Sequence, residues 1–348
     1  MLTDLAITID SHILNLIADL DEFKGRWEAL GKLAPEKLSS LRRVATIESV
    51  GSSTRIEGAR LSDREVETLL SNLDIKSFRS RDEEEVAGYA EAMNLVFESF
   101  EHIPLTENHI RQIHGILLKY STKDERHRGH YKSLPNHVEA FGPDGKNLGI
   151  VFETASPFDT PRLMTELARE TVEELAGDRW HPLMVIGAFV VHFLAIHPFQ
   201  DGNGRLSRVL TTLLLLQSGY RYVPYSSLER IVEENKDSYY RALRASQKNI
   251  RTPGENLDDW IRFFLHILKQ QKDVLLRKLE REKQLEKLPP AAEQILILAR
   301  EQGRLTISGA VTLLGINRNT AKAHLRRLVE QGYLVQHGKG RGTSYSPS

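Results

Sequence analysis

The stretch HPFQDGNGRLSR, residues 197–208, lies between two segments whose apolar residues recur at helical spacing. The apolar run 183–196 predicts a helix that ends at His197, because Pro198 cannot continue it. The glycines that follow permit a tight turn and a close approach of the backbone, and the next helix is expected to begin at about Arg205. Backbone N–H groups at the start of a helix, beside glycines, form a cradle for anions.

The side chains of this stretch suit a nucleotide. A neutral imidazole at His197 can take a proton from a hydroxyl group, and Asp201 offers the hard oxygen ligand that Mg²⁺ prefers. Arg205 and Arg208 share a helix face, where two guanidinium groups suit a polyphosphate better than one carboxylate. The alternative is a tight turn with solvated arginines and a histidine satisfied in the core, but the twelve residues in combination favour a phosphate site.

Most of the remaining chain has helical spacing. Ser62, with Glu65 three residues later, forms a capping box that begins one helix. Residues 35–50 carry an apolar stripe, expected to be the buried face of an amphipathic helix, made of Leu38, Leu41, Val44, Ala45 and Ile47. Further helices are expected over residues 82–100, 107–120, 161–176, 206–218, 235–249 and 256–287.

The helical pattern breaks between residues 126 and 160. NHVEAF (136–141) and LGIVFE (148–153) are typical of short strands, and Asp144-Gly145 between them is a hairpin signal. Pro289-Pro290 ends the last long helix and is expected to be a linker. We therefore predict a mainly α fold: a helical bundle with one inserted β-hairpin, followed by a small C-terminal domain.

Composition excludes several kinds of protein. The 348 residues suggest about two domains, and the absence of cysteine excludes disulfides, cysteine-based zinc sites and thiol nucleophiles. Lys and Arg number 47, as do Asp and Glu, so no overall charge attracts the chain to nucleic acid or lipid. The N-terminus lacks the pattern of a secretory signal, and the run 183–196 is shorter than the roughly 20 residues of a membrane span. We expect a soluble, cytoplasmic protein with no membrane partner.

HPFQDGNGRLSR matches every fixed position of HPFx(D/E)GNGRxxR, so the chain resembles the Fic (Fic/DOC) domain family over about residues 40–250. The resemblance implies a helical bundle with a hairpin flap, and transfer of AMP from ATP to a hydroxyl side chain of a target protein. It implies that His197 is the general base, that Asp201 binds Mg²⁺ and that Phe199 anchors the loop. The residues implied to hold the phosphates are Gly202, Asn203 and Gly204 for the α- and β-phosphates, and Arg205 and Arg208 for the β- and γ-phosphates.

A second motif, STRIEG, lies at residues 53–58. Ser53 and Glu57 are four residues apart and share a helix face, and Gly58 would end that helix. Alone, this is an ordinary helix terminus with a solvated glutamate. Beside the first motif it resembles the family's (S/T)xxxE(G/N) inhibitory motif, which implies that Glu57 pairs with Arg208 and removes a partner of the γ-phosphate. In some relatives this glutamate also supports removal of AMP.

Two further segments resemble parts of the family. GHYK (129–132), followed by Asn136, His137, Val138 and Glu139, is similar to the start of the flap, although Lys132 and Glu139 replace the usual Arg and Gly. The flap backbone would bind a target segment as an added strand, with target preference left open. Tyr239, Tyr240 and Gln247 stand where relatives use a Tyr-Tyr pair and often an Asn near adenine; packing of the tyrosines against helices is the alternative.

The C-terminal segment 291–348 contains eight Lys and Arg and three Asp and Glu, a net charge of +5. Its order resembles a winged helix-turn-helix: a helix (291–301), a short strand near residues 305–306, a helix (307–314), a turn at Gly315, a helix (about 318–331), then Tyr333–Val335 and a tip at residues 338–342. That resemblance places Arg318, Asn319, Thr320, Lys322 and Ala323 toward a DNA major groove, and Lys339 and Arg341 toward phosphates. A packing or dimerisation module is the alternative.

Together these observations predict three regions: residues 1–100 with the inhibitory helix, 101–288 with the catalytic core, and 289–348 with the winged module. We predict a protein adenylyltransferase that uses ATP and Mg²⁺, is inhibited by Glu57, and acts on a Ser, Thr or Tyr hydroxyl of a target protein or of itself. The alternatives are transfer of another nucleotide or phosphate group, and a DNA-binding regulator whose core only senses nucleotide. DNA and a second copy of the chain are the further partners that the C-terminal module suggests.

Overall fold

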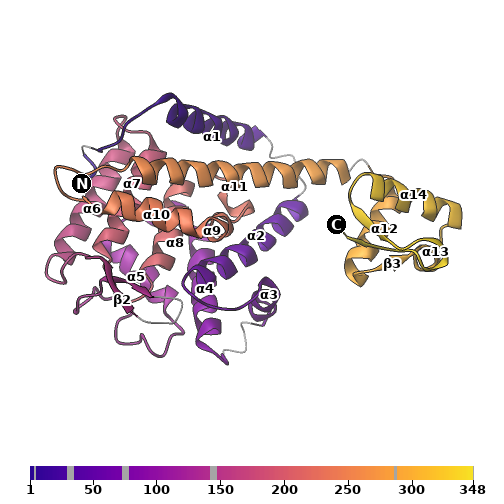
Figure 1. Ribbon diagram of the computed structural model, residues 1–348, viewed down its shortest axis with the longest axis horizontal. Helices are drawn as coiled ribbons and strands as arrows, with labels where there is room; N and C mark the ends of the chain where they lie inside the picture. The colour runs from indigo at the N-terminus through magenta and orange to yellow at the C-terminus, as the bar shows by residue number, and fades with distance from the viewer. Residues whose placement is uncertain (4, 30–34, 73–77, 142–146, 286–287, 348) are drawn as a thin grey trace. The chain divides into compact units, whose positions relative to one another are not determined.

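A computed structural model describes residues 1–3, 5–29, 35–72, 78–141, 147–285 and 288–347 (Figure 1). They belong to two compact units, residues 1–275 and 276–348, which are described separately. The finer division of the first unit near residue 100 stays a prediction. No helix in the described ranges is both long enough and apolar enough to cross a membrane.

Two helices joined by the stretch quoted above form the centre of the first unit. In α7, Pro182–Ile196, every residue from 183 to 196 is buried, so this helix has no solvent face. The second, α8 (Asn203–Gln217), packs against it and begins two residues before the predicted start at Arg205. The apolar run 183–196 therefore forms a core helix rather than an amphipathic one.

The other helices of the first unit surround this pair (Figure 1). The capping box at Ser62 and Glu65 is confirmed, and Thr106 caps the helix that follows it. The helices at 11–29 and 228–234 were not predicted from the sequence. The helices are α1 Ser11–Ala29, α2 Pro35–Ile56, α3 Asp63–Leu70, α4 Arg81–Ser99, α5 Glu107–Leu117, α6 Thr160–Ala176, α9 Leu228–Glu234, α10 Lys236–Gln247 and α11 Asp258–Leu285.

The helix predicted over residues 35–50 is present as part of α2, but its apolar stripe is only partly buried: Leu38, Leu41 and Ile47 are half-buried. Of the five stripe residues only Ala45 is buried, and Val44 is 46% exposed. Burial instead falls on the C-terminal half of α2, where Gly51, Ser52 and Ser53 are buried. Small side chains let this half of the helix lie close to α4, α8 and α9, so close packing decides its orientation more than an apolar stripe does.

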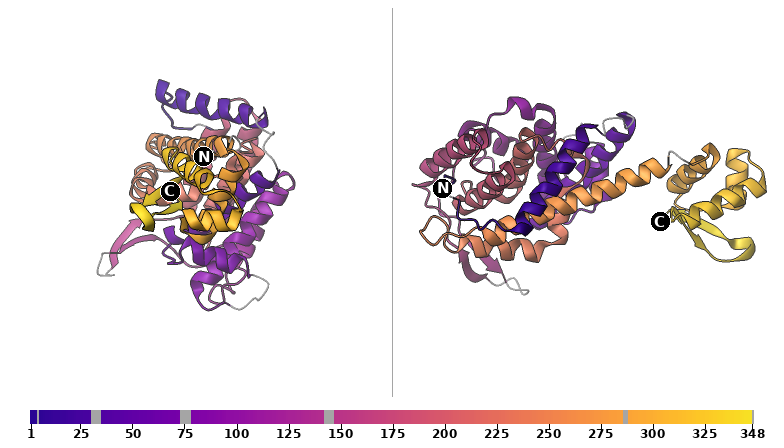
Figure 2. Two further views of the ribbon diagram at one scale, coloured as in Figure 1. Left: turned by 90° about the vertical axis from the view of Figure 1, so that its right-hand side faces the viewer. Right: turned by 90° about the horizontal axis from the view of Figure 1, so that it is seen from above.

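The predicted hairpin is present and extends from the body of the first unit (Figure 2). It consists of β1, Val138–Phe141, and β2, Asn147–Phe152, which pair antiparallel with Val138 opposite Phe152. The predicted turn at Asp144-Gly145 lies outside the described residues.

The second unit has its own apolar core and a three-stranded sheet in the order β3-β5-β4. Pro289-Pro290 is not a simple linker, because Pro290 takes the first helical position of α12, where a missing N–H is harmless, and Leu288 joins the core. The order of elements is as predicted, with β5 in addition. They are α12 Pro290–Gln302, β3 Leu305–Thr306, α13 Ile307–Leu314, α14 Arg318–Glu330, β4 Leu334–His337 and β5 Ser344–Pro347.

Candidate functional site

The loop between α7 and α8 is built to a fixed shape. His197 ends α7 in the left-handed conformation, with φ 52° and ψ 60°, and Gly202 precedes α8 with φ 80°. The side chain of Asn203 closes the loop, since its Oδ1 accepts from Phe199 N at 2.9 Å and its Nδ2 donates to Phe199 O at 2.7 Å. The Phe199 ring is fully buried and stacks on His114 at 3.8 Å. Asn203 therefore braces the loop with its side chain, and only its backbone is free to face a ligand.

The His197 imidazole has the protonation state of a base. Its Nδ1 lies 3.3 Å from Leu194 O, and because a carbonyl can only accept, Nδ1 carries the proton. The Nε2 lone pair is then free to accept a proton from another group. Burial, aided by the positive charge of Lys132, lowers the pKa of His197 to about 4, so the ring is neutral at pH 7.

A cavity of about 350 Å³ lies beside this loop, within the size range of small-molecule sites. It brings together residues from the loop, the start of α8, the hairpin, α10 and the end of α2. Arg208, Ser53, Asn136 and His137 do not line it. The predicted residues that line it are Glu57, Val138, His197, Asp201, Gly202, Asn203, Gly204, Arg205, Tyr239, Tyr240 and Gln247.

Glu57, which follows α2 in the chain, places its carboxylate against the first turn of α8. Glu57 lines the cavity, whereas Arg208, with which it pairs, does not. Arg208 Nη2 is 2.8 Å from Glu57 Oε1, and the same guanidinium donates to Ser53 Oγ at 2.8 Å and to Ser53 O at 2.9 Å. A Cβ added to Gly204 would collide with Glu57 Oε1, so the carboxylate rests directly on the first turn of α8. Burial alone would lower the pKa of Arg208, but the Glu57 carboxylate raises it above its usual value. A carboxylate thus occupies the place where backbone N–H groups and Arg208 favour an anion.

Arg205 and Asp201 form a second group of charges at the rim of the cavity. Arg205 is 2% exposed and pairs with Glu85 at 3.0 Å and with Asp201 at 3.3 Å. Asp201 also pairs with Arg81 at 3.0 Å. Burial would raise the pKa of Asp201, but Arg205 beside it holds the pKa below its ordinary value, so the carboxylate is ionised. Both arginines are therefore paired with carboxylates in this structure, Arg205 with Glu85 and Asp201, and Arg208 with Glu57.

Asp201 is a reasonable ligand for Mg²⁺ but does not form a protein metal cage. Among the described residues, no group of three or more His, Asp or Glu side chains could hold a metal. Mg²⁺ is usually bound by one or two carboxylates together with substrate phosphates and water, so a single ionised Asp201 beside a phosphate cradle fits that pattern.

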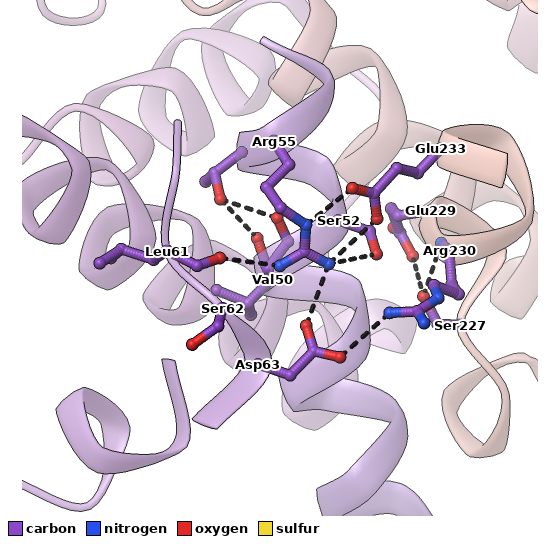
Figure 3. Close-up of polar contacts among 12 residues, drawn as sticks. Val50, Ser52, Arg55, Leu61, Ser62, Asp63, Ser227, Glu229, Arg230 and Glu233 are labelled. Carbon is purple, nitrogen blue, oxygen red and sulfur yellow. Dashed lines mark hydrogen bonds and ion pairs between the residues drawn. The ribbon is translucent and has the colours of Figure 1, made fainter. Parts of the chain in front are cut away.

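A polar cluster that was not predictable from a local sequence pattern holds the end of α2 (Figure 3). Arg55 binds Glu233 of α9 with two bonds, Nε to Oε1 at 2.7 Å and Nη2 to Oε2 at 3.0 Å. Its Nη2 is also 3.0 Å from Asp63 Oδ1, at the start of α3, and Asp63 Oδ2 pairs with Arg230 at 3.0 Å. The cluster therefore ties the segment that carries Glu57 to α3 and α9.

The predicted flap residues divide between the loop and the cavity. Asn136 Nδ2 donates to His197 O at 3.2 Å and to Phe199 O at 2.5 Å, so it supports the loop. Val138 lines the cavity, and buried His137 Nδ1 has no hydrogen-bond partner among the described residues. Glu139 pairs with Ile150 in the hairpin backbone.

The predicted adenine residues line the end of the cavity on α10. Tyr239 and Tyr240 meet edge to face at 5.0 Å, and Tyr239 also packs against Trp260 at 5.7 Å. Gln247 is 4% exposed. The tyrosine pair is therefore both packed and cavity-lining, so the two interpretations of it do not exclude each other.

Comparison with known proteins supports the resemblance drawn from residues 197–208. Residues 104–215 match the Fic/DOC family, and residues 280–343 match a family described as a bacterial protein of unknown function (DUF977). The chain is 27% identical over 222 residues to "Protein adenylyltransferase Fic" of Drosophila persimilis, covering 62% of this chain and 40% of that protein. For the Drosophila melanogaster protein of the same name the identity is 26% over 238 residues, covering 67% and 44%. The chain thus spans less than half the length of these curated relatives.

Solved structures agree on the fold. A Fic family protein from Desulfovibrio desulfuricans G20 has a TM-score of 0.61 at 24% identity and covers 99% of this chain and 98% of that chain. A Fic domain containing signaling protein from Bacteroides thetaiotaomicron has a TM-score of 0.56 at 25% identity and covers 78% of this chain and 94% of that chain. The predicted family resemblance and the mainly helical fold class are both confirmed.

Proposed function

We propose that this chain is a protein adenylyltransferase that transfers AMP from ATP to the hydroxyl of a Ser, Thr or Tyr side chain in a target protein. The observation that carries the proposal is the cavity in which neutral His197 lies beside the first turn of α8. The match to the Fic/DOC family and the similarity to Fic adenylyltransferases support the same reaction.

The proposed reaction is an in-line displacement at the α-phosphorus of ATP. His197 Nε2 accepts the proton of the target hydroxyl as its oxygen forms a bond to the α-phosphorus. The bond from that phosphorus to the oxygen that bridges to the β-phosphorus breaks, and pyrophosphate leaves. Positioning and charge neutralisation supply most of the acceleration, and the base contributes about 10²–10⁴-fold.

The residues of the cavity take separate roles in this proposal. The backbone of residues 202–204 and the start of α8 hold the phosphates, and Asp201 would hold Mg²⁺, which would supply positive charge to neutralise them. Val138, Tyr240 and Gln247 surround the adenine of ATP at the other end of the cavity. The cradle binds phosphates and selects less for the nucleobase. Transfer of another nucleotide or of a phosphate group is therefore the alternative reaction at the same site.

In the same proposal Glu57 is an inhibitory residue. Its carboxylate pairs with Arg208 at 2.8 Å and covers Gly204, where it competes with the terminal phosphate for the same guanidinium and the same helix N-terminus. ATP that binds beside Glu57 would be held without its Arg208 contact, in a pose that does not favour attack.

The proposal is tested by incubating the wild type and Glu57→Gly with cell lysate and ATP labelled on the α-phosphate. Glu57→Gly is expected to label a target or itself at least about tenfold faster, the change that corresponds to a loss of about 1.4 kcal/mol of inhibition. His197→Ala in the Glu57→Gly background is the control and should abolish labelling while ATP still binds. Equal labelling by wild type and Glu57→Gly contradicts inhibition, and absence of labelling in both contradicts the transferase.

Parallel reactions distinguish the nucleotides. GTP, CTP and UTP labelled on the α-phosphate test other nucleotidyl transfers, and ATP labelled on the γ-phosphate tests phosphate transfer. Labelling only from α-labelled ATP is expected.

A second candidate function concerns the second unit, which we propose binds double-stranded DNA. Arg318, Asn319, Lys322 and Ala323 are exposed on one face of α14. Arg326 of the same helix pairs with Glu330, whereas Arg318 and Lys322 form no ion pair with any described side chain. A regulator that only senses nucleotide would keep its DNA response in His197→Ala.

A further inference from the structure

Lys132 and Asn136, which precede the hairpin in the chain, donate hydrogen bonds to the four successive carbonyl groups of residues 196–199, around His197. Lys132 and Asn136 supply a donor to each of the four carbonyls, and both lie more than 60 residues from the loop in sequence. The bonds run from Lys132 Nζ to Ile196 O (3.0 Å), from Lys132 N to Pro198 O (2.8 Å), and from Asn136 Nδ2 to His197 O (3.2 Å) and Phe199 O (2.5 Å).

The Lys132 ammonium is buried and forms no ion pair with any described side chain. It is 4% exposed, and its three hydrogens go to neutral oxygens: Ile196 O, Asn136 Oδ1 at 2.7 Å and Thr154 Oγ1 at 2.9 Å. Burial of a cation that is satisfied only by neutral groups is unfavourable. Asn136 precedes β1 and Thr154 follows β2, so this one ammonium joins both ends of the hairpin to the loop.

The backbone that Lys132 and Asn136 hold is strained. A left-handed conformation at a residue other than glycine costs about 1–3 kcal/mol and persists only where the surrounding structure enforces it. The carbonyls on both sides of His197, and its own, are all bound, so the loop cannot relax by rotating these peptide groups without losing hydrogen bonds.

We infer that Lys132, with Asn136, is a positioning residue that holds His197 in its left-handed conformation and so directs Nε2 into the cavity. The inference rests on the proposed function for its catalytic consequence, but the geometry it describes does not. Neither residue touches the reacting atoms in this arrangement, since neither lines the cavity.

The charge of Lys132 adds an electrostatic effect. Burial is the main cause that lowers the pKa of His197 and Lys132 lowers it further, while Glu57 and Asp201 act in the opposite direction. Burial, with Arg251 nearby, lowers the pKa of Lys132 itself to about 8. Above that pH the amine has only two hydrogens for three acceptors, so the transfer rate should fall as pH rises through about 8.

The test compares variants of the full chain in the Glu57→Gly background. Lys132→Met should lower kcat for self-labelling by about 10²-fold, the effect of a misplaced catalytic group, with KM for ATP changed by less than about threefold. Lys132→Arg should keep most of kcat and lose the fall in rate above pH 8. Lys272→Met is the matched control, because Lys272 is also buried, at 5% exposure, but pairs with Asp19 away from the cavity. It should lower the thermal midpoint without changing kcat.

A second measurement is independent of activity. NMR titration of the ¹⁵N-labelled imidazoles, with His197 assigned from its absence in His197→Ala, should give a higher pKa for His197 in Lys132→Met than in the wild type. Asn136→Ala removes carbonyl bonds but keeps the ammonium, so it should lower kcat without raising that pKa, and it serves if Lys132→Met does not fold. If Glu57→Gly labels nothing, the proposed function fails while the titration still tests this inference. Unchanged His197 pKa in Lys132→Met, or an equal loss of kcat in Lys272→Met, overturns it.

Discussion

Gly204 is the residue at which the competition between Glu57 and a phosphate can be measured. In the wild type, Gly204→Ala should lower the free energy of unfolding by about 1 kcal/mol, because the new methyl group displaces the Glu57 carboxylate from its contact with Arg208. In the Glu57→Gly background the collision is gone, and alanine should raise the free energy of unfolding by up to about 1 kcal/mol through helix propensity.

Urea unfolding of the four proteins in this cycle gives the coupling between residues 57 and 204. A loss of the same size in both backgrounds would show that the carboxylate does not rest on Gly204. Binding of ATP should weaken in Gly204→Ala even without Glu57, because the methyl group narrows the phosphate cradle.

Two histidines with lowered pKa values make the free energy of unfolding depend on pH. Burial lowers the pKa of both His197 and His114 to about 4, below their ordinary value of about 6.5. The unfolded chain therefore binds more protons between these limits, so the free energy of unfolding should be highest above pH 6.5 and fall toward pH 4. The slope is at most about 1.4 kcal/mol per pH unit for each histidine.

His114→Gln provides the comparison for this pH dependence. His114 accepts a hydrogen bond from Gly129 N at 3.0 Å through Nδ1 and lies 3.0 Å from Asp201 O through Nε2, so a protonated ring would lose the first bond. Denaturant unfolding from pH 7.5 to 4.5 should show a shallower slope in His114→Gln. The same slope in both proteins would show that His114 does not contribute.

At the residue scale, the chemical groups of the loop 197–208 could be predicted from the sequence. The residues elsewhere in the chain that hold this loop in place could not. His197, Asp201 and the two glycines belong to one short stretch, and that stretch carries the turn, the helix start and the charges together. Lys132 and His114 contact the loop from 60 to 90 residues away in the chain, and no local pattern contains such a pair.

At the scale of elements, α2 shows the limit of reading apolar stripes. Its apolar stripe is only partly buried, while Gly51, Ser52 and Ser53 in its C-terminal half are buried, and such small residues carry no hydrophobic signal. The helix itself, its end at Gly58 and the capping box of α3 were predictable, because caps and helix stops depend on residues within one turn.

The cluster around Arg55 should control how firmly Glu57 is held. Arg55→Gln removes the two-bond pair with Glu233 and the contact with Asp63 (Figure 3). Hydrogen bonds to charged groups contribute about 1.5–3 kcal/mol, so self-labelling should rise by roughly tenfold or less and stay below that of Glu57→Gly.

Arg262→Gln is the control for Arg55→Gln. It removes a similar ion pair, with Asp10 at 2.8 Å, from another part of the first unit. If it raises labelling as much as Arg55→Gln does, general loosening of the unit explains the effect, and the cluster has no specific part in inhibition.

At the scale of the whole molecule, the balanced charge of 47 against 47 conceals a local asymmetry. The order of helices and strands in the second unit was predictable because glycines and caps separate short elements there. The boundary of the compact units was not, because α11 continues past residue 275 and the first residues of the second unit are the end of that helix.

That asymmetry predicts salt-dependent binding of DNA by the full chain. Arg318→Ala with Lys322→Ala removes two exposed charges from α14, and should weaken binding to a random-sequence duplex and reduce the slope of log affinity against log salt by about 2. Arg326→Ala removes a charge already paired with Glu330 on the same helix, so it should change the slope by less than about 1. Fluorescence anisotropy at 50 to 200 mM salt, a range of about fourfold, resolves slopes of this size. If the wild type binds with no salt dependence, or the double variant binds as the wild type does, this face of α14 does not contact phosphate, and packing against another protein surface explains its exposed residues better.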